Sequence, residues 1–320
     1  MMSPRYSLVI PAYNDASGLA RTLRYFETCS AAVEILLVDD GSEDNTAEVV
    51  EQARLPASVT LEYHRQPHNQ GPAAARNLGI ENARADRLLF LDADDILTPN
   101  IFALLDQVDL RQDFILFKHH LATRKDQIHS YNMHLADRQF FSNLARGGYP
   151  AESLRLKDCP EAAGTVNFPW NKLYRRDFLL EQEIRFPDYR MHEDILFHWQ
   201  CFLRCGDFAV LNWAPPLLTH FELPAAGRAT HYVGEKRLAV VDLLAQVEDE
   251  LLRHPDALSL EPVFAEFCEE IFTWMITTLK QDEAGNSWTQ RYQDAAERFW
   301  SNSKIAPPEQ PQDETGDEAW

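Results

Sequence analysis

The 320-residue chain is 45% hydrophobic, which is enough to bury one large core, or one core and a smaller second unit. Its 30 basic and 50 acidic residues give a formal net charge of −20, which argues against nucleic acid or an anionic membrane held by charge alone. The 5 cysteines follow no paired CxxC spacing, and the sequence has no signal peptide and no long apolar run, so we expect a cytoplasmic protein with buried free thiols and no transmembrane segment.

Strand and helix patterns alternate along the first hundred residues. Strands are predicted at 6–11, 33–40, 58–66 and 87–92, and helices at 17–30, 46–54, 71–84 and 100–108. The run at 33–40 is continuously apolar, as in a strand whose two faces are both covered. This alternation predicts a parallel sheet wrapped by helices, and such sheets bind ligands beyond the carboxyl ends of their strands.

The rest of the chain changes character twice. A strand is predicted at 113–120, and helices at 137–147 and 191–205. From about residue 235 the pattern is entirely helical, with apolar stripes that we expect to pack on the rest of the protein. A dimer contact and a membrane-surface helix are the alternatives. The last residues, PPEQPQDETGDEAW, are proline-rich and acidic and are predicted to be disordered.

The stretch LLFLDADDILTP, residues 88–99, leads a buried strand directly into Asp92, Asp94 and Asp95. Clustered carboxylates repel one another, so a positive group is expected beside them. Mg²⁺ and Mn²⁺ prefer hard oxygen ligands, commonly one or two carboxylates completed by substrate phosphates and water. The alternative, a surface turn in which Asp95 caps the next helix, explains Asp95 better than it explains Asp92 and Asp94.

Two further polar loops follow predicted strands. In VDDGSEDNT (38–46), Asp40 could accept a hydrogen bond from a nucleobase or a ribose, or the loop could simply be a turn with a helix cap. In NQGPAAARNLG (69–79), the helix N-terminus could bind an anion and its alanines permit close approach to the sheet, but Arg76 could equally be an exposed helical arginine. Each of these two signals leaves both alternatives open.

Taken together and in order, these segments resemble a known family. SLVIPAYN, VDDGSEDNT, NQGPAAARN and FLDADDILTP, followed by WNKLYRRDFL, IRFP and HEDILF, are similar to the inverting nucleotide-sugar glycosyltransferases of family 2, of the bacterial surface-glycan type. The resemblance covers about residues 5–205. It implies a GT-A fold, that is, an α/β fold with a mostly parallel Rossmann-like sheet flanked by helices, here with a C-terminal helical extension.

The resemblance also implies roles for particular residues. The residues expected to contact the nucleotide or donor are Pro11, Tyr13, Asp40, Arg76 and Asp92. Asp92 and Asp94 would form the DxD pair, with Asp94 the direct ligand of Mn²⁺ or Mg²⁺. Asp194 would be the general base, with Glu193 in a supporting role.

The acceptor side is less clearly marked. Trp170 and Asn171 either line an acceptor-sugar pocket, since aromatic faces and amides suit carbohydrate, or belong to the core. Related enzymes have a tyrosine- and arginine-rich loop that closes over the diphosphate, and the comparable stretch here, 215–232, lacks that pattern. Its candidates for the closing role are His220, Arg228 and His231, and none is assigned.

The expected organisation is a GT-A domain at 1–230, with a nucleotide-binding half at about 1–118 and an acceptor-side half at about 119–230. A helical extension at 231–302 and a disordered acidic tail at 303–320 follow. The expected partners are a nucleotide-sugar donor, with UDP the expected nucleotide, and a glycan or lipid-linked saccharide acceptor, met in the cytoplasm or at the inner face of the membrane. Peripheral membrane contact and a homo-oligomer both remain open.

Two rival functions deserve comparison. A sugar-nucleotide pyrophosphorylase would need a glycine- and arginine-rich loop after the first strand, and PAYNDASG does not supply one. A non-catalytic regulator that binds a nucleotide-sugar would not need the DxD and HED motifs, which are both intact here.

Overall fold

The computed structural model describes residues 3–108, 111–122, 132–147, 153–221, 232–282 and 284–308. The nucleotide-side elements are β1 (Tyr6–Ala12), α1 (Ala16–Phe26), β2 (Val33–Asp39), α2 (Thr46–Gln52), β3 (Val59–Arg65), α3 (Pro72–Asn82), β4 (Arg87–Phe90), β5 (Ile96–Leu97), α4 (Ile101–Leu105) and β6 (Phe114–Phe117). The strand and helix alternation predicted for this half is confirmed, although α4 is shorter than the predicted helix.

The second half begins with β7 (His119–Ala122), α5 (Leu135–Gly147), and the 3-10 helices η1 (Leu156–Asp158), η2 (Pro160–Gly164) and η3 (Pro169–Asn171). It continues with β8 (Lys172–Arg175), α6 (Arg176–Glu181), α7 (Glu193–Arg204), β9 (Phe208–Leu211) and β10 (Leu218–Phe221). The C-terminal elements are the 3-10 helix η5 (Glu235–Leu238), α8 (Ala239–Leu251), α9 (Ala257–Thr278) and α10 (Thr289–Asn302).

The strands form a large mixed sheet in the order β3-β2-β1-β4-β8-β6-β9. β3, β2, β1 and β4 are parallel, whereas β8 runs antiparallel to both β4 and β6. A small sheet of β5, β10 and β7 lies beside it. The carboxyl ends of β1, β2, β3 and β4 therefore meet at one edge of the large sheet, and the three polar loops that the sequence singles out follow β2, β3 and β4 there.

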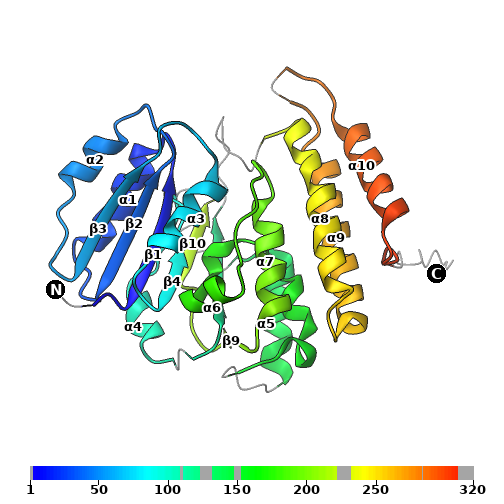
Figure 1. The fold of residues 1–320 in the computed structure, drawn as a ribbon, viewed down its shortest axis with the longest axis horizontal. Coiled ribbons are helices and arrows are strands. Elements are labelled where there is room, and N and C mark those ends of the chain that lie inside the picture. Colours follow the sequence, from blue (N-terminus) through cyan, green and yellow to red (C-terminus); the bar gives the residue numbers. More distant parts are fainter. Residues whose placement is uncertain are drawn as a thin grey trace, which may run out of the picture.

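Side chains of the central strands alternate between two cores, one on each face of the large sheet. On β1, Leu8 and Ile10 belong to the core that α1, α2 and α4 cover, whereas Val9 belongs to the other core. That second core continues through α7 into the C-terminal helices, where Trp199 meets Phe264 and Phe267 with ring centroids 5.2 and 5.5 Å apart. Figure 1 shows α7 between the sheet and the yellow-to-red C-terminal helices. The prediction that their apolar stripes pack on the rest of the protein is confirmed.

Helix α3 lies very close to the sheet. A Cβ atom at Gly79 would come within 2.3 Å of the Val9 side chain, so only glycine fits at this crossing. Ala73 and Ala75 are buried on the same helix. The small residues thus bring α3, and Arg76 with it, against β1 as the sequence predicts.

The predicted disordered tail begins too early. Ser303, Lys304 and Ile305 dock on α8, where Glu248 Oε1 accepts hydrogen bonds from Ser303 Oγ (2.7 Å), Lys304 N (2.6 Å) and Ile305 N (3.0 Å). The Ile305 side chain is buried against the same core. The predicted start of the disordered tail at 303 is therefore wrong, because the buried Glu248 carboxylate accepts hydrogen bonds from this stretch. The remaining tail, 309–320, lies outside the described residues.

Two further expectations concern the whole chain. All 5 cysteines are free; Cys159, Cys201 and Cys268 are buried as expected, whereas Cys29 and Cys205 are only partly buried. In the parts of the chain that the structure describes, no helix is both long and apolar enough to cross a membrane.

Candidate active site

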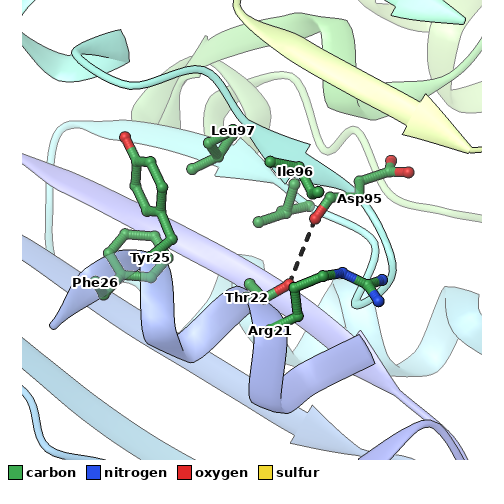
Figure 2. A pocket seen from close by; sticks show the side chains of 8 residues that line it. Arg21, Thr22, Tyr25, Phe26, Asp95, Ile96 and Leu97 are labelled. Carbon is green, nitrogen blue, oxygen red and sulfur yellow. Dashed lines mark hydrogen bonds between the residues drawn. The ribbon is translucent and has the colours of Figure 1, made fainter. Parts of the chain in front are cut away.

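Side chains of α1 form hydrogen bonds with the loop of residues 92–95 that follows β4, which we call the aspartate loop. Thr22 Oγ1 donates to Ala93 O at 2.9 Å, and Arg21 Nη2 donates to Asp94 O at 2.9 Å. Figure 2 shows Thr22 bonded to Asp95, whose backbone oxygen accepts from Thr22 Oγ1 at 3.4 Å. Arg21, Thr22 and Asp95 help to line a pocket of about 50 Å³. That pocket has room for little more than a water molecule, so it belongs to the packing of α1 on the loop and not to a nucleotide site.

Asp95 is fully buried, and the N-cap of the next helix, α4, is Asn100. Its carboxylate oxygens lie 3.0 and 3.1 Å from Nδ1 of His220, and Oδ1 also accepts from Phe221 N at 3.2 Å. Burial raises the pKa of Asp95 to about 6 against the effect of His220. Burial would lower the pKa of His220, but the neighbouring aspartates raise it to about 9, so both groups are charged at neutral pH. The helix-cap alternative for Asp95 is therefore wrong, because this ion pair fastens β10 to the aspartate loop.

The pairing of His220 with Asp95 also bears on which residue could close over the diphosphate. His220 is 8% exposed, stacks on Trp170 with ring centroids 4.8 Å apart, and has Asp95 as its partner. It is consequently committed to the protein interior. The other two candidates, Arg228 and His231, lie outside the described residues.

Arg76 joins the two acidic motifs. Its Nη2 donates to Asp92 Oδ1 at 2.9 Å and its Nη1 to Glu193 Oε1 at 2.8 Å, while the guanidinium carbon lies 5.3 Å from the centroid of the Phe186 ring. Burial would lower the pKa of Arg76, but the charges of Asp92 and Glu193 outweigh it and raise that pKa. The exposed-arginine alternative is wrong, since Arg76 is 7% exposed and bridges segments far apart in the sequence.

Glu193 and Asp194 open helix α7, where carboxylates favour the positive end of the helix dipole. The residue before them, His192, has φ 63°, a left-handed conformation that few non-glycine residues adopt. Burial raises the pKa of Asp194 to about 7, with the charge of Glu193 adding to the effect and Arg76 opposing it. A carboxyl group with a pKa near the working pH is suited to accept a proton from a hydroxyl.

Asp40 anchors the turn before α3. It is 4% exposed, and its two carboxylate oxygens accept from Gln70 N at 2.6 Å and Gly71 N at 2.8 Å. Asp39 likewise stabilises the loop that follows β2, since its Oδ1 accepts a hydrogen bond from Ser42 N at 2.8 Å. The contact to the base predicted for Asp40 stays a prediction, and the role that the geometry gives it is to fix the loop 69–71.

Pro11 is the last residue but one of β1, and Tyr13 follows that strand directly. Pro11 pairs with Val38 in the parallel register of β1 and β2 and is partly buried. Tyr13 is 49% exposed, so its ring is available at the edge of the sheet. Their predicted contact with a nucleotide is compatible with these positions and remains a prediction.

Arg190 is a residue that the sequence analysis does not single out. Its Nη1 and Nη2 donate to Asn69 Oδ1 (2.5 Å) and Asn69 O (3.1 Å), and its side chain lies against Gly71. The segment before α7 is thereby fastened to the turn before α3. A basic residue between the IRFP and HED segments is the one sequence signal that could have pointed to it.

Trp170 and Asn171 have no exposed surface, so they offer nothing for a sugar to touch. The Trp170 ring packs against Phe168 and His220, with centroids 5.2 and 4.8 Å away, and those two rings also contact each other at 5.5 Å. Asn171 donates to Asp137 Oδ2 at 3.2 Å and accepts from Lys172 Nζ at 2.7 Å. The core alternative fits both residues, and the acceptor-pocket assignment is corrected accordingly.

The site can supply hard oxygen ligands, but not a complete metal cage. Within the described residues no group of at least three histidine, cysteine or acidic side chains is arranged to hold a metal ion. Asp92 and Asp94 are both partly exposed at the sheet edge, where Arg76 pairs with Asp92 and His220 pairs with Asp95. This donor set fits Mg²⁺ or Mn²⁺, which commonly takes one or two carboxylates and completes its shell with substrate phosphates and water.

Comparisons with known proteins place the chain in a family. The family model described as Glycosyl transferase family 2 matches residues 7–181. A glycosyltransferase of Haemophilus influenzae, described as uncharacterized, is 33% identical over 124 residues, which are 38% of this chain and 47% of that protein, so the match spans about half of that relative. The glycosyltransferase GlyG of Streptococcus pneumoniae is 26% identical over 221 residues, 66% of this chain and 69% of that protein.

Two solved structures share the fold. TarS of S. aureus, crystallised with UDP-GlcNAc, superposes with a TM-score of 0.71 at 19% identity, covering 93% of this chain and 81% of that chain. The mannosyltransferase PcManGT of Pyrobaculum calidifontis, in complex with GDP-Man and Mn²⁺, gives 0.54 at 16% identity, covering 95% and 89%. The expected GT-A fold is confirmed.

Proposed function

The chain belongs to glycosyl transferase family 2, and from that premise we propose that it is a metal-dependent inverting glycosyltransferase. Its donor would be a nucleoside-diphosphate sugar, with UDP the expected nucleotide, and its acceptor a hydroxyl of a glycan or lipid-linked saccharide. One observation carries the proposal: the ion pairs of Arg76 join Asp92 to Glu193, and so set Asp194 beside the aspartate loop.

The donor end is proposed to lie along the carboxyl ends of β1 and β2. Asp40 shapes this end by holding the loop 69–71, and the exposed ring of Tyr13 stands beside it. UDP is favoured by the fold shared with TarS, which was solved with UDP-GlcNAc, whereas PcManGT was solved with GDP-Man and Mn²⁺. The nucleotide is therefore a choice that binding has to test.

Asp94 is the proposed direct metal ligand, with Asp92 beside it. A bound Mg²⁺ or Mn²⁺ would neutralise the charge that develops on the leaving diphosphate. Arg76 keeps Asp92 in place by bonding one of its oxygens. Asp95 supports the proposed metal site indirectly, because its ion pair with His220 fixes the loop that carries Asp92 and Asp94.

Asp194 is the proposed general base. As the acceptor oxygen attacks the anomeric carbon, the bond from that carbon to the diphosphate oxygen breaks on the opposite face, which inverts the configuration. The hydroxyl proton passes to the Asp194 carboxylate, whose raised pKa makes it a better proton acceptor than an ordinary aspartate. Glu193 supports it indirectly, through Arg76.

A donor panel tests the proposal. The full chain is incubated with UDP-linked and GDP-linked sugars, with Mn²⁺ or with a chelator, and released nucleotide is measured. We expect slow release that depends on the metal and on one class of donor. Donor binding without turnover on any acceptor would contradict the enzyme and favour the non-catalytic regulator.

A thermal-shift screen identifies the donor independently of turnover. A donor present at about one hundred times its dissociation constant adds about 2.7 kcal/mol to the free energy of unfolding, which is readily visible in a melting curve.

A further inference from the structure

The helix that carries Asp194 is fastened at both ends to the C-terminal helices. At its far end, Arg204 Nε donates to Glu250 Oε1 of α8 at 2.6 Å, and Gln200 Nε2 donates to the Oε2 of the same carboxylate at 3.2 Å. At its start, Arg237 Nη1 of η5 lies 3.5 Å from Nε2 of His192, the residue before Glu193. The helix is thus held by a segment that the family match at 7–181 does not include.

Arg237 is itself held rigidly. It is 4% exposed, its Nε donates to Tyr232 O at 3.0 Å, and its guanidinium carbon lies 4.9 Å from the centroid of the Trp274 ring of α9. The same segment is tied to α10, because Gly234 N donates to the hydroxyl of Tyr292 at 2.9 Å. The planar guanidinium can bond a carbonyl and an imidazole in fixed directions while stacking on a ring, which an ammonium group cannot do.

His192 is a residue that needs such support. Its left-handed backbone is unfavourable for a side chain with a Cβ and persists where the surroundings hold it. Burial, with the charge of Arg237 adding to its effect, lowers the pKa of His192 to about 3, so the imidazole is neutral and presents an acceptor lone pair to Arg237. His192 O in turn accepts from Ile195 N at 3.0 Å, which closes the first turn of α7 around Glu193 and Asp194.

We propose that Arg237 is a positioning residue for Asp194: by holding His192 in its left-handed conformation, it fixes the direction in which the first turn of α7 presents the carboxylate. This inference rests on the proposed role of Asp194 as general base. It gives the C-terminal helices a part in catalysis, since η5, α9 and α10 together place the Arg237 guanidinium.

The test compares Arg237→Gln with Lys236→Gln, which removes the same charge from an exposed neighbour in the same turn. Arg237→Gln should lower kcat for transfer about 10- to 100-fold while the donor dissociation constant stays within about twofold, since a small misplacement of a catalytic group has costs of this order. Lys236→Gln should match wild type. Arg237→Lys keeps the charge but loses the planar guanidinium. This variant should fold, and its kcat should lie between those of wild type and Arg237→Gln.

A double-mutant cycle tests whether Arg237 acts through His192. His192→Asn removes the imidazole but tolerates the left-handed conformation. The double variant should be no slower than the slower single variant, because both changes break one linkage. Additive losses in kcat would overturn the proposed route.

Hydrogen exchange makes the inference independent of turnover. In Arg237→Gln, a peptide covering residues 188–197 should exchange faster than in wild type and Lys236→Gln. If Arg237→Gln exchanges like wild type, the inference is overturned. The inference is also overturned if Arg237→Gln keeps the wild-type kcat while Asp194→Asn is inactive. In both cases the proposed function still stands. Failure of wild type to turn over any donor would instead defeat the proposed function, and exchange would then decide the structural part alone.

Discussion

At the scale of single residues, the site depends on how a few charges are shared. Arg76 serves as the counter-ion of both Asp92 and Glu193, and His220 serves Asp95. A buried charge is costly unless it is paired, so each carboxylate tied in this way has a fixed place. Asp94 and Asp194, which are partly exposed, are the proposed reactive members of the same group.

Asp94→Ala is expected to abolish Mn²⁺-assisted UDP binding and to leave the fold intact. Removing one carboxylate from a mutually repelling cluster costs the protein without bound metal little, whereas the metal loses its proposed direct ligand. Titration calorimetry of UDP with and without Mn²⁺ measures the effect. Wild-type affinity for UDP with Mn²⁺ in this variant would show that the DxD assignment is wrong.

Asp194→Asn is expected to keep the melting temperature at about pH 4, where the wild-type carboxyl is also neutral, to keep the donor affinity, and to lower transfer by roughly 10²–10⁴-fold, the usual span for a general base. Asparagine has nearly the same shape and can still bond at the helix start, but it cannot accept the proton. Glu193→Gln should be milder, because its proposed role is indirect. Near-normal transfer by Asp194→Asn on the true acceptor would refute the mechanism.

The raised pKa of Asp194 also makes a prediction about stability. Its folded-state pKa of about 7 lies above the unfolded value of about 3.9, so its contribution to stability is complete below about pH 4 and is lost as the pH rises through 7. Asparagine does not titrate. The melting temperature of Asp194→Asn relative to wild type should therefore rise between pH 4 and pH 8, and a constant difference across that range would contradict the raised pKa.

At the scale of elements, the edge of the sheet is built by loops that bind one another. Asp40 at the end of β2 holds the turn before α3, and Arg190 before α7 holds the same turn from the other side. The position of α3 then determines the position of Arg76. The proposed donor end and the proposed catalytic end of the site are consequently connected through one helix.

Asp40→Ala is expected to lower the free energy of unfolding by about 1–3 kcal/mol, because the buried N–H groups of Gln70 and Gly71 lose their acceptor. It should also weaken UDP binding. Comparing UDP with free diphosphate separates the two roles of Asp40: a selective loss for UDP indicates contact with the base, and equal losses indicate the anchoring role alone. An unchanged melting temperature would contradict the anchoring role.

At the scale of the whole molecule, the C-terminal helices complete the core that begins on the sheet. Trp199 on α7 packs against rings of α9, and residues 303–305 close over α8 through Glu248. The matched family region and the C-terminal helices are therefore joined by a shared core, and not by a linker alone.

Two truncations distinguish the docked residues from the tail. A chain that ends at Ile305 keeps all three bonds to Glu248 and should retain the wild-type melting temperature and UDP affinity. A chain that ends at Asn302 loses those bonds and the buried Ile305 side chain, and should be less stable by about 1–3 kcal/mol or more. A large loss of stability in the longer chain would show that residues after Ile305 also dock.

The amino-acid sequence by itself determined the local elements and the chemistry of the loops. Apolar runs and their periodicity were enough to predict β1 to β4 and α1 to α3, because strand and helix spacing is a local property of the chain. Small residues in NQGPAAARNLG predicted the close approach of α3, and the acidic motifs predicted where the charge would gather. Each of these signals lies within one short segment.

Only the tertiary structure decided which residues meet. Arg76 and Glu193 are 117 positions apart, and Asp95 and His220 are 125 apart, so no local pattern relates them. The aromatic ring of Trp170 is chemically suited to contact a sugar, which is why the sequence suggested that role. Its burial depends on contacts with Phe168 and His220, which only the folded chain brings together. The docking of Ile305 and the reach of Arg237 to His192 follow from the packing of the C-terminal helices on α7. Pairing and burial are properties of the assembled core, and for that reason the sequence could supply the residues of the site but not their partners.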